Sequence, residues 1–198
     1  MMRLKHVAIF CLLLLPELAL AHKPIKGLSH FVNGLVHPFL VPAQVLLVLA
    51  FGFLIGQKGL TKLGRPYVSF TFALITGLVI TGLINSVDAE IFVLSLAALI
   101  GLLNAASLKI PQWSYFLIAI IVGFSLGLDS SQEAFVGKAK FAALFGSGVT
   151  LYFFSLYPIG LAEYCQKGSW QKITIRILSS WITASALLVL ALQLHSNK

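Results

Sequence analysis

The sequence predicts an all-α integral membrane protein, a bundle of about six transmembrane helices that follows a cleavable signal peptide. Composition is the first reason. Of the 198 residues, 59% are hydrophobic and only 10% are charged, whereas a soluble domain carries about 25% charged residues. The second reason is arrangement, because the hydrophobic residues form long runs separated by short loops. The third is that the charged residues gather in those loops, leaving a mean hydropathy of +0.96.

The first segment, residues 1–21, has the parts of a signal peptide. A basic start precedes the apolar core Val7–Leu15, which is too short to span a bilayer, and Ala19–Ala21 matches an A-x-A cleavage site. We therefore expect cleavage after this segment and a single transmembrane domain over residues 22–198. An uncleaved anchor helix is the alternative.

Six apolar runs follow, each long enough for roughly 20 residues of helix. Prolines lie near their ends, where a helix tolerates them, and Pro42 either opens the first run or kinks it just inside its start. The third and fourth runs are the shortest. The predicted spans are about Phe39–Ile55, Val68–Ile84, Ile91–Ala106, Trp113–Leu128, Phe141–Leu161 and Ile173–Leu194.

The loop charges predict how these spans are oriented. The loops 57–66, 107–112 and 163–176 carry seven of the nine lysines and arginines between residues 39 and 194, whereas the turn 86–90 carries only acidic charges. The positive-inside rule places the basic loops in the cytoplasm, and the N-terminus of the mature chain, the acidic turn, the loop 129–140 and the C-terminus outside. The net charge of +8 therefore orients helices and does not indicate a nucleic-acid partner.

No motif for catalysis or nucleotide binding is present. The chain has no glycine-rich phosphate loop, and its mid-span positions supply no acid, base or nucleophile, so we expect no enzyme. Polar groups inside a span are costly in lipid and indicate either a functional site or a hydrogen bond between helices. The candidates for a polar path through the membrane are Gln44, Asn85, Asn104 and Asp129.

Three of the five histidines, His22, His30 and His37, lie between the predicted signal peptide and the first span. Cleavage would leave His22 with a free amino group beside its imidazole, and such nitrogens suit nickel, cobalt, copper and zinc. His30 and His37 would lie about two turns apart on one helix face. They could share an ion only if the segment folds back, which Asn33-Gly34 would allow. Because His37 precedes Pro38, we expect an extended or turn conformation there.

These positions predict an outward-facing metal-capture pair, His22 and His37, with His30 as an optional third ligand. The alternative is that each is an ordinary polar residue of an exposed tail or of the membrane interface.

The residues Ala19–His22 and Phe31–Pro38, in this order before the first span, resemble the HupE/UreJ family. Its members are small bacterial membrane proteins with a signal peptide, a histidine after the cleavage site, and a histidine–proline motif that opens the first of about six spans. The resemblance implies uptake of nickel for hydrogenase or urease, or of cobalt, with no tightly bound cofactor. It also implies a multi-pass protein of the bacterial inner membrane, which the loop charges orient with both termini on the periplasmic side.

This sequence departs from the family where further ligands are expected. The histidine–proline motif of the family continues into an aspartate–histidine pair, and those positions are Ala43 and Gln44 here. The stretch Gly123–Ser131 and the fifth span, Phe141–Leu161, also lack the histidines that the family carries. The remaining set would be oxygen-rich and less selective for nickel. It comprises His22, His37, Gln44 and Asp129.

Three functions fit this sequence. The first is a divalent transition-metal permease or metal-capture protein. The second is a non-transporting scaffold, assembly factor or complex subunit on the same fold, and the third is a transporter of an uncharged small solute. The expected partners are the lipid bilayer and a metal ion, together with a larger membrane-protein complex or a second copy of the chain.

Overall fold

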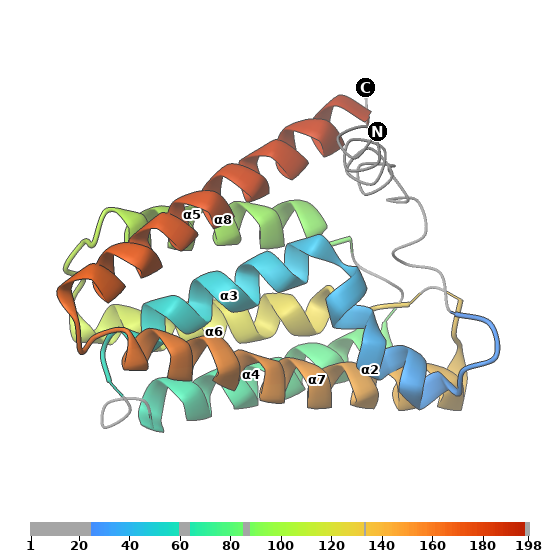
Figure 1. Ribbon diagram of the computed structural model, residues 1–198. Coiled ribbons are helices and arrows are strands. Elements are labelled where there is room, and N and C mark those ends of the chain that lie inside the picture. The colour runs from blue at the N-terminus through green and yellow to red at the C-terminus, as the bar shows by residue number, and fades with distance from the viewer. Residues whose placement is uncertain (1–24, 60–63, 85–87, 133, 197–198) are drawn as a thin grey trace, which may run out of the picture.

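The computed structural model describes residues 25–59, 64–84, 88–132 and 134–196, and within them every regular element is an α-helix (Figure 1). The predicted signal peptide, His22 and Asn85 lie outside the described residues. The prediction of an all-α fold is confirmed for the part described. The helices are α2 (His30–Leu40), α3 (Pro42–Gly56), α4 (Gly64–Leu83), α5 (Glu90–Ala105), α6 (Gln112–Leu128), α7 (Gly137–Tyr164) and α8 (Ser169–Ser196).

Not all of these helices are long enough to cross a bilayer alone. By length and composition α4, α7 and α8 could span a membrane, and the bent pair of α2 and α3 would count as a fourth span. The apolar helices α5 and α6 have 16 and 17 residues. At a rise of 1.5 Å per residue they reach about 25 Å, less than the roughly 30 Å of a bilayer's hydrocarbon core. The six predicted runs therefore correspond to α3–α8, but only three or four spans are supported.

The first predicted span, Phe39–Ile55, is interrupted. α2 ends at Leu40, α3 begins at Pro42, and the two helices meet at a bend of 69°. Val41 between them is extended, with φ −98° and ψ 104°. Proline suits the first position of a helix because its missing N–H has no partner there in any case. Pro42 therefore opens α3, and the residues before it form a separate helix.

The expected extended or turn conformation at His37 is wrong. His37 and Pro38 both lie inside α2, and the helix continues unbroken through Asn33 and Gly34. The residue before a proline is biased away from the helical region, but packing overrides this bias. Gly34 lies so close to the backbone of α7 that a Cβ there would overlap the carbonyl of Ala143. Docking against α7 thus holds α2 helical.

α3 is the central helix of the bundle, and most of its residues are buried. Figure 1 shows it between α5 and α8 on one side and α4, α6 and α7 on the other. The small residues Gly52 and Gly56, four positions apart, lie on the face of α3 that packs against α7. A Cβ at Gly52 would meet the ring of Pro158, and one at Gly56 would meet the carbonyl of Ile159. Small residues at these positions allow close approach of the two helices.

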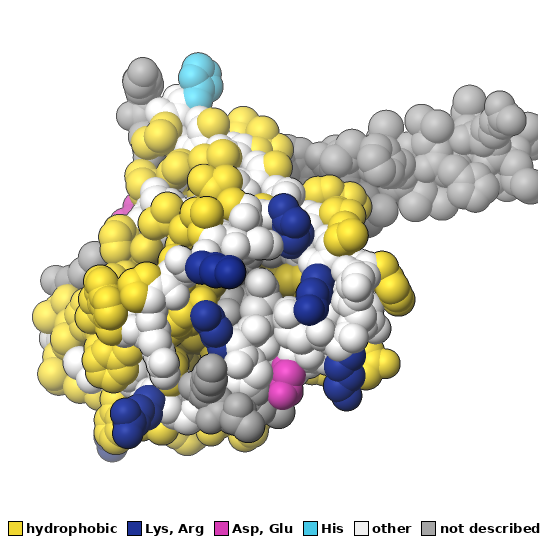
Figure 2. All heavy atoms as spheres, turned by 90° about the vertical axis from the view of Figure 1, so that its left-hand side faces the viewer, with side chains coloured by type: hydrophobic (Ala, Val, Ile, Leu, Met, Phe, Trp, Pro, Cys, Tyr) yellow, Lys and Arg dark blue, Asp and Glu magenta, His cyan; other side chains and the backbone are white. Residues whose placement is uncertain are grey.

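The charged side chains are sorted between the two ends of the bundle. Figure 2 looks onto the end that holds the loops after α3, α5 and α7, here called the basic end, where several blue side chains surround an acidic one. Its described cations are all exposed: Lys58, Arg65, Lys109, Lys167, Lys172 and Arg176. The opposite end mixes both signs, with Lys26, Lys138 and Lys140 beside Asp88, Glu90 and Asp129. The loops that the sequence predicts to share a side do lie at the same end.

Candidate functional site

A buried polar pair joins α3 to the end of α6, at the end opposite the basic end. The side-chain amide of Gln44 donates from Nε2 to the backbone carbonyl of Asp129 and to its carboxylate Oδ2, both over 2.9 Å. Gln44 is fully buried, and Asp129 is only 5% exposed. Two residues that the sequence analysis singled out separately, 85 positions apart in the chain, therefore form one contact.

The turn that follows α6 extends this polar cluster. Ser130, Ser131 and Gln132 are all buried, and the Ser130 hydroxyl donates to the carbonyl of Leu126 over 2.7 Å. Gln44 Oε1 and Ser131 Oγ are buried atoms without a hydrogen-bond partner among the described residues. An amide oxygen has two lone pairs that can accept. The Gln44–Asp129 region therefore retains oxygen atoms whose lone pairs are available to a ligand. We call Gln44 and Asp129–Gln132 the outer polar cluster, after the side on which the loop charges predict this end.

The short helix α2 is fixed beside this cluster by hydrogen bonds from α7. Because Pro38 has no N–H, the carbonyl of Gly34 lacks its usual helical donor four residues ahead. The Ser147 hydroxyl donates to that carbonyl over 3.1 Å, and Thr150 Oγ1 donates to the next one, of Leu35, over 2.7 Å. The proline of the histidine–proline motif thus creates an acceptor that binds α2 to α7.

The histidine of the motif is buried at the bend. His37 is 3% exposed and lies in the last turn of α2, where its carbonyl accepts from the Val41 N–H over 3.3 Å. Gln44 is the third residue of α3, and its own N–H donates to the Val41 carbonyl over 3.1 Å. His37 and Gln44 therefore flank Val41 on two helices of different direction.

His30 is not brought to His37. It is exposed at the first position of α2 and packs edge-on against the ring of Phe135, with centroids 5.0 Å apart. Seven residues of unbroken helix separate the two imidazoles by about 10 Å along the axis. His22, the other half of the predicted capture pair, lies outside the described residues.

Asn104, which the sequence places with Gln44 and Asp129 on a polar path, lies in a different part of the molecule. Its Nδ2 donates to the carbonyl of Ala50 over 2.8 Å, and its Oδ1 accepts from Gln57 Nε2 over 3.4 Å. Asn104 therefore links α5 to the middle and the basic-end half of α3. Between Gln44 and Ala50, α3 buries Leu47 and Val48 completely, so the two polar regions are separated by apolar packing.

Several polar residues at the end that holds the outer polar cluster were not identified from the sequence. The run Ser130–Gln132 follows an apolar helix directly, as a surface loop would, yet all three residues are buried. Asn33 was read as part of a turn, yet its side chain ties down the segment before α2. Its Oδ1 accepts from the Ile25 N–H over 2.7 Å, and its Nδ2 donates to the Leu28 carbonyl over 3.2 Å. The only signal in the sequence was a polar residue inside an otherwise apolar stretch.

The donor set limits which ions this end could hold. Within residues 25–59, 64–84, 88–132 and 134–196, no three His, Cys, Asp or Glu side chains gather into a group able to hold a metal ion. The outer polar cluster offers one carboxylate with amide and hydroxyl oxygens, and His37 lies on the neighbouring helix. Oxygen donors suit harder cations, whereas imidazole suits nickel, cobalt, copper and zinc. The described residues thus fit part of a coordination shell, with positions left for water or for donors elsewhere in the chain.

Comparison with known proteins agrees with the resemblance found in the sequence. The family model described as HupE / UreJ protein matches residues 10–189 of the chain. No curated protein and no solved structure matches it. The matched range covers most of the chain, including α2, the outer polar cluster and every helix up to most of α8. The chain therefore belongs to the HupE/UreJ family, which is associated with nickel and cobalt uptake.

Proposed function

We propose that this member of the HupE/UreJ family captures a divalent transition-metal ion of the nickel or cobalt type at the outer polar cluster and passes it into the membrane domain. The observation that carries the proposal is the buried contact of Gln44 with Asp129 beside the bend between α2 and α3. The ion is the substrate, so weak and incomplete coordination by protein side chains is consistent with passage.

The burial of Asp129 supports this function. A buried aspartate is energetically costly in a membrane protein and is retained where it binds a cation or a partner. Gln44 fixes the carboxylate through Oδ2 and the neighbouring carbonyl. A carboxylate held in a low-dielectric surrounding attracts a cation far more strongly than one in water.

The bend supplies the second argument. A bent pair of helices leaves main-chain groups outside the regular ladder, and such groups occur in membrane proteins where they are buried in protein or line a cavity. Because Pro42 has no N–H, the carbonyl of Pro38 receives no helical hydrogen bond from it. The histidine–proline motif and the bend therefore add an imidazole and a main-chain carbonyl oxygen just before α3, the helix whose Gln44 holds Asp129.

One observation favours a second function. The described residues lack a group of three His, Cys, Asp or Glu side chains able to hold a metal ion. A non-transporting scaffold, assembly factor or complex subunit on the same fold needs no such group. In that case the Gln44–Asp129 contact would serve only to join α3 to α6, and the protein would bind no metal.

Metal binding by the purified chain in detergent separates these functions. Nickel, cobalt, copper and zinc are titrated into the wild type and into Asp129→Asn and His37→Gln. We expect saturable binding of nickel or cobalt that weakens about tenfold or more in Asp129→Asn, because the lost charge removes most of the attraction. His195→Gln is the matched control, since His195 is exposed in the last turn of α8.

Binding that is equal in the wild type and in Asp129→Asn would overturn the assignment of the site. Absence of binding by a wild-type chain whose N-terminus has been sequenced would favour the scaffold function. Uptake of the radioactive ion by cells is then compared for the same three variants, and capture without passage would appear as binding with no uptake.

A further inference from the structure

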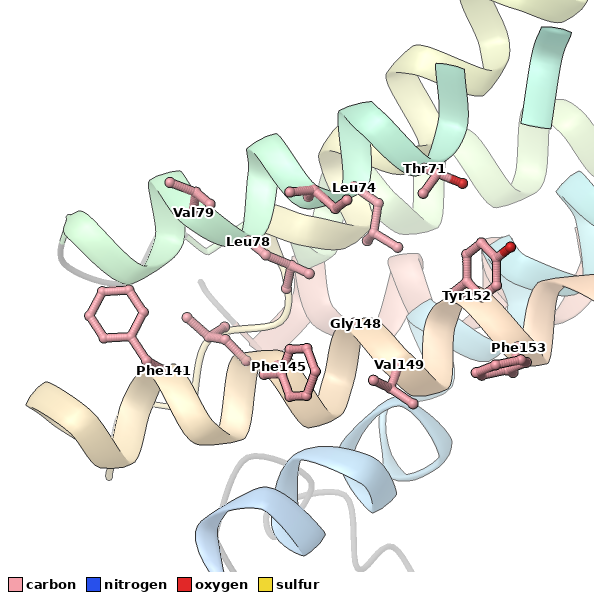
Figure 3. A pocket seen from close by; sticks show the side chains of 12 residues that line it. Thr71, Leu74, Leu78, Val79, Phe141, Phe145, Gly148, Val149, Tyr152 and Phe153 are labelled. Carbon is pink, nitrogen blue, oxygen red and sulfur yellow. The ribbon is translucent and has the colours of Figure 1, made fainter. Parts of the chain in front are cut away.

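An apolar groove runs between α4 and α7 on the surface that would face lipid (Figure 3). It has a volume of about 480 Å³, and almost all the side chains that line it are apolar. The hydroxyl of Thr71, one of its few polar atoms, already donates to the carbonyl of Tyr67 over 2.9 Å. Figure 3 shows Leu74, Leu78 and Val79 of α4 facing α7, with Phe141 at one end and Tyr152 and Phe153 at the other.

Two glycines give the groove its shape. Gly148 lies on its floor, where a Cβ would stand only 2.7 Å from Cδ1 of Leu78. A larger residue would therefore displace Leu78 into the open space. At the outer end the ring of Phe141 rests on Gly82, whose Cβ would lie 2.5 Å from the ring. Phe141 thus lines the outer end of the groove.

The length of the groove matches one leaflet of a bilayer. Its lining runs from Phe141 to Phe153 along α7 and from Thr71 to Val79 along α4, which corresponds to about 12–18 Å at 1.5 Å per residue. Half of the hydrocarbon core measures about 15 Å. The groove begins near the end of the molecule that holds the outer polar cluster and stops near the middle of α7.

A cation stands at the outer end of the groove. Lys140 directly precedes Phe141 and is half-buried. Its Nζ reaches across to donate to the carbonyl of Ile84, over 2.8 Å, just beyond the end of α4. An ammonium group has three donors, so two remain for another acceptor. The first turn of α7 also carries Lys138 and no acidic residue.

We propose that this groove binds one anionic phospholipid, with an acyl chain along α4 and α7 and the phosphate at Lys140. The length and apolar lining of the groove fit the acyl chain, and the cation at its outer end fits the phosphate. A whole helix of a second copy would not enter the groove and could place only side chains in it. The groove's volume over about 15 Å gives a mean cross-section near 30 Å², whereas a helix 10–12 Å wide needs about 80–110 Å².

Native mass spectrometry of the full chain released from detergent tests this site. Palmitoyl-oleoyl phosphatidylglycerol or the matching phosphatidylcholine is titrated in, and the fraction of protein that retains one lipid is measured. We expect phosphatidylglycerol to be retained about tenfold more tightly, because its net negative charge is available to Lys140. Lys140→Gln should remove this preference, while Lys109→Gln at the basic end should keep it.

A second pair of variants tests the groove itself. Val149→Trp fills it, and we expect most of the retention of both lipids to be lost. Ile177→Trp adds the same side chain on α8, at a position 48% exposed and away from the groove, and should retain lipid as the wild type does. If Val149→Trp does not fold, Ile75→Trp on the opposite wall replaces it.

Equal retention of the two lipids by the wild type would overturn the headgroup assignment. A preference for phosphatidylglycerol that is as strong in Lys140→Gln as in the wild type would also overturn it. A wild-type dimer that Val149→Trp converts to monomer would overturn the proposal in favour of a second copy on this face. None of these variants alters Gln44 or Asp129, so a failure here leaves the metal-capture function untouched.

Discussion

The amide of Gln44 donates to both the backbone carbonyl and the carboxylate of Asp129, over 2.9 Å in each case. This bidentate contact fixes the end of α6 against the first turn of α3. It also fixes the orientation of the amide, because both partners are acceptors and only Nε2 can donate to them. Oε1 is consequently the atom that faces away from Asp129.

Replacing Gln44 by leucine should therefore lower stability. The variant keeps the approximate volume but removes two hydrogen bonds, one of them to a carboxylate, and we expect a loss of about 2 kcal/mol in the free energy of unfolding. The measurement is denaturant unfolding of the protein in detergent. Gln166→Leu is the control, since the amide of Gln166 makes only a long contact of 3.5 Å to the Ala162 carbonyl. Equal stability of the two variants would show that the Gln44 contact contributes nothing.

The close approach of α2 to α7 should be sensitive to one methyl group. A Cβ at Gly34 would overlap the carbonyl of Ala143, so Gly34→Ala should push α2 from its position and lower the melting temperature. Gly160 in α7 has open space around its Cα, and Gly160→Ala should raise stability by up to about 1 kcal/mol through helix propensity. Opposite signs for the two alanines are expected, and a gain in both would contradict the packing described for α2.

The hydrogen bond from Ser147 to Gly34 should matter only while residue 38 is proline. In the wild type, Ser147→Ala leaves the buried Gly34 carbonyl without its side-chain donor and should cost about 1 kcal/mol. In a Pro38→Ala background the alanine N–H can supply that carbonyl, and the same substitution should cost less. A double-mutant cycle on unfolding in detergent measures the difference, expected at about 0.5–1 kcal/mol. Additive effects would mean that proline and serine are not coupled.

Thiol labelling would test the sidedness that the loop charges predict. In a chain whose native cysteines are replaced by serine, Lys109→Cys should react with a membrane-impermeant maleimide only after the cells are opened. Lys138→Cys should react in intact cells whose outer membrane admits the reagent. The positive-inside rule requires this difference, and labelling in the reverse order would place the outer polar cluster in the cytoplasm.

The apolar runs predicted the helices well because lipid leaves the backbone of a spanning segment no other way to satisfy its hydrogen bonds. The bend at Val41 was harder to predict. Pro38 and Pro42 read as markers near one helix end, yet the first lies inside α2 and the second begins α3. What decides between these readings is the docking of Gly34 on α7, more than a hundred residues away, which no local pattern contains.

The sequence predicted individual residues of the candidate site but not which of them contact one another. Gln44 and Asp129 were selected because polar groups are rare in apolar runs, and that reasoning brought out both members of the contact. It could not distinguish them from Asn104, which shares the same signal but serves to join α5 to α3. Partners of a polar residue in a bundle depend on helix packing, and only the three-dimensional arrangement separates a structural amide from one beside a buried carboxylate.

The bend between α2 and α3 also shapes the electric field at this end. Each helix carries roughly half a negative charge at its C-terminus and half a positive charge at its N-terminus. α2 and α6 both end here, at Leu40 and Leu128, whereas α3 begins here at Pro42. The C-termini of α2 and α6 add negative charge to that of the Asp129 carboxylate, and the N-terminus of α3 offsets part of it. The helix ends closest to Gln44 and Asp129 therefore add to the attraction of the carboxylate for a cation at this point, whichever metal supplies the charge.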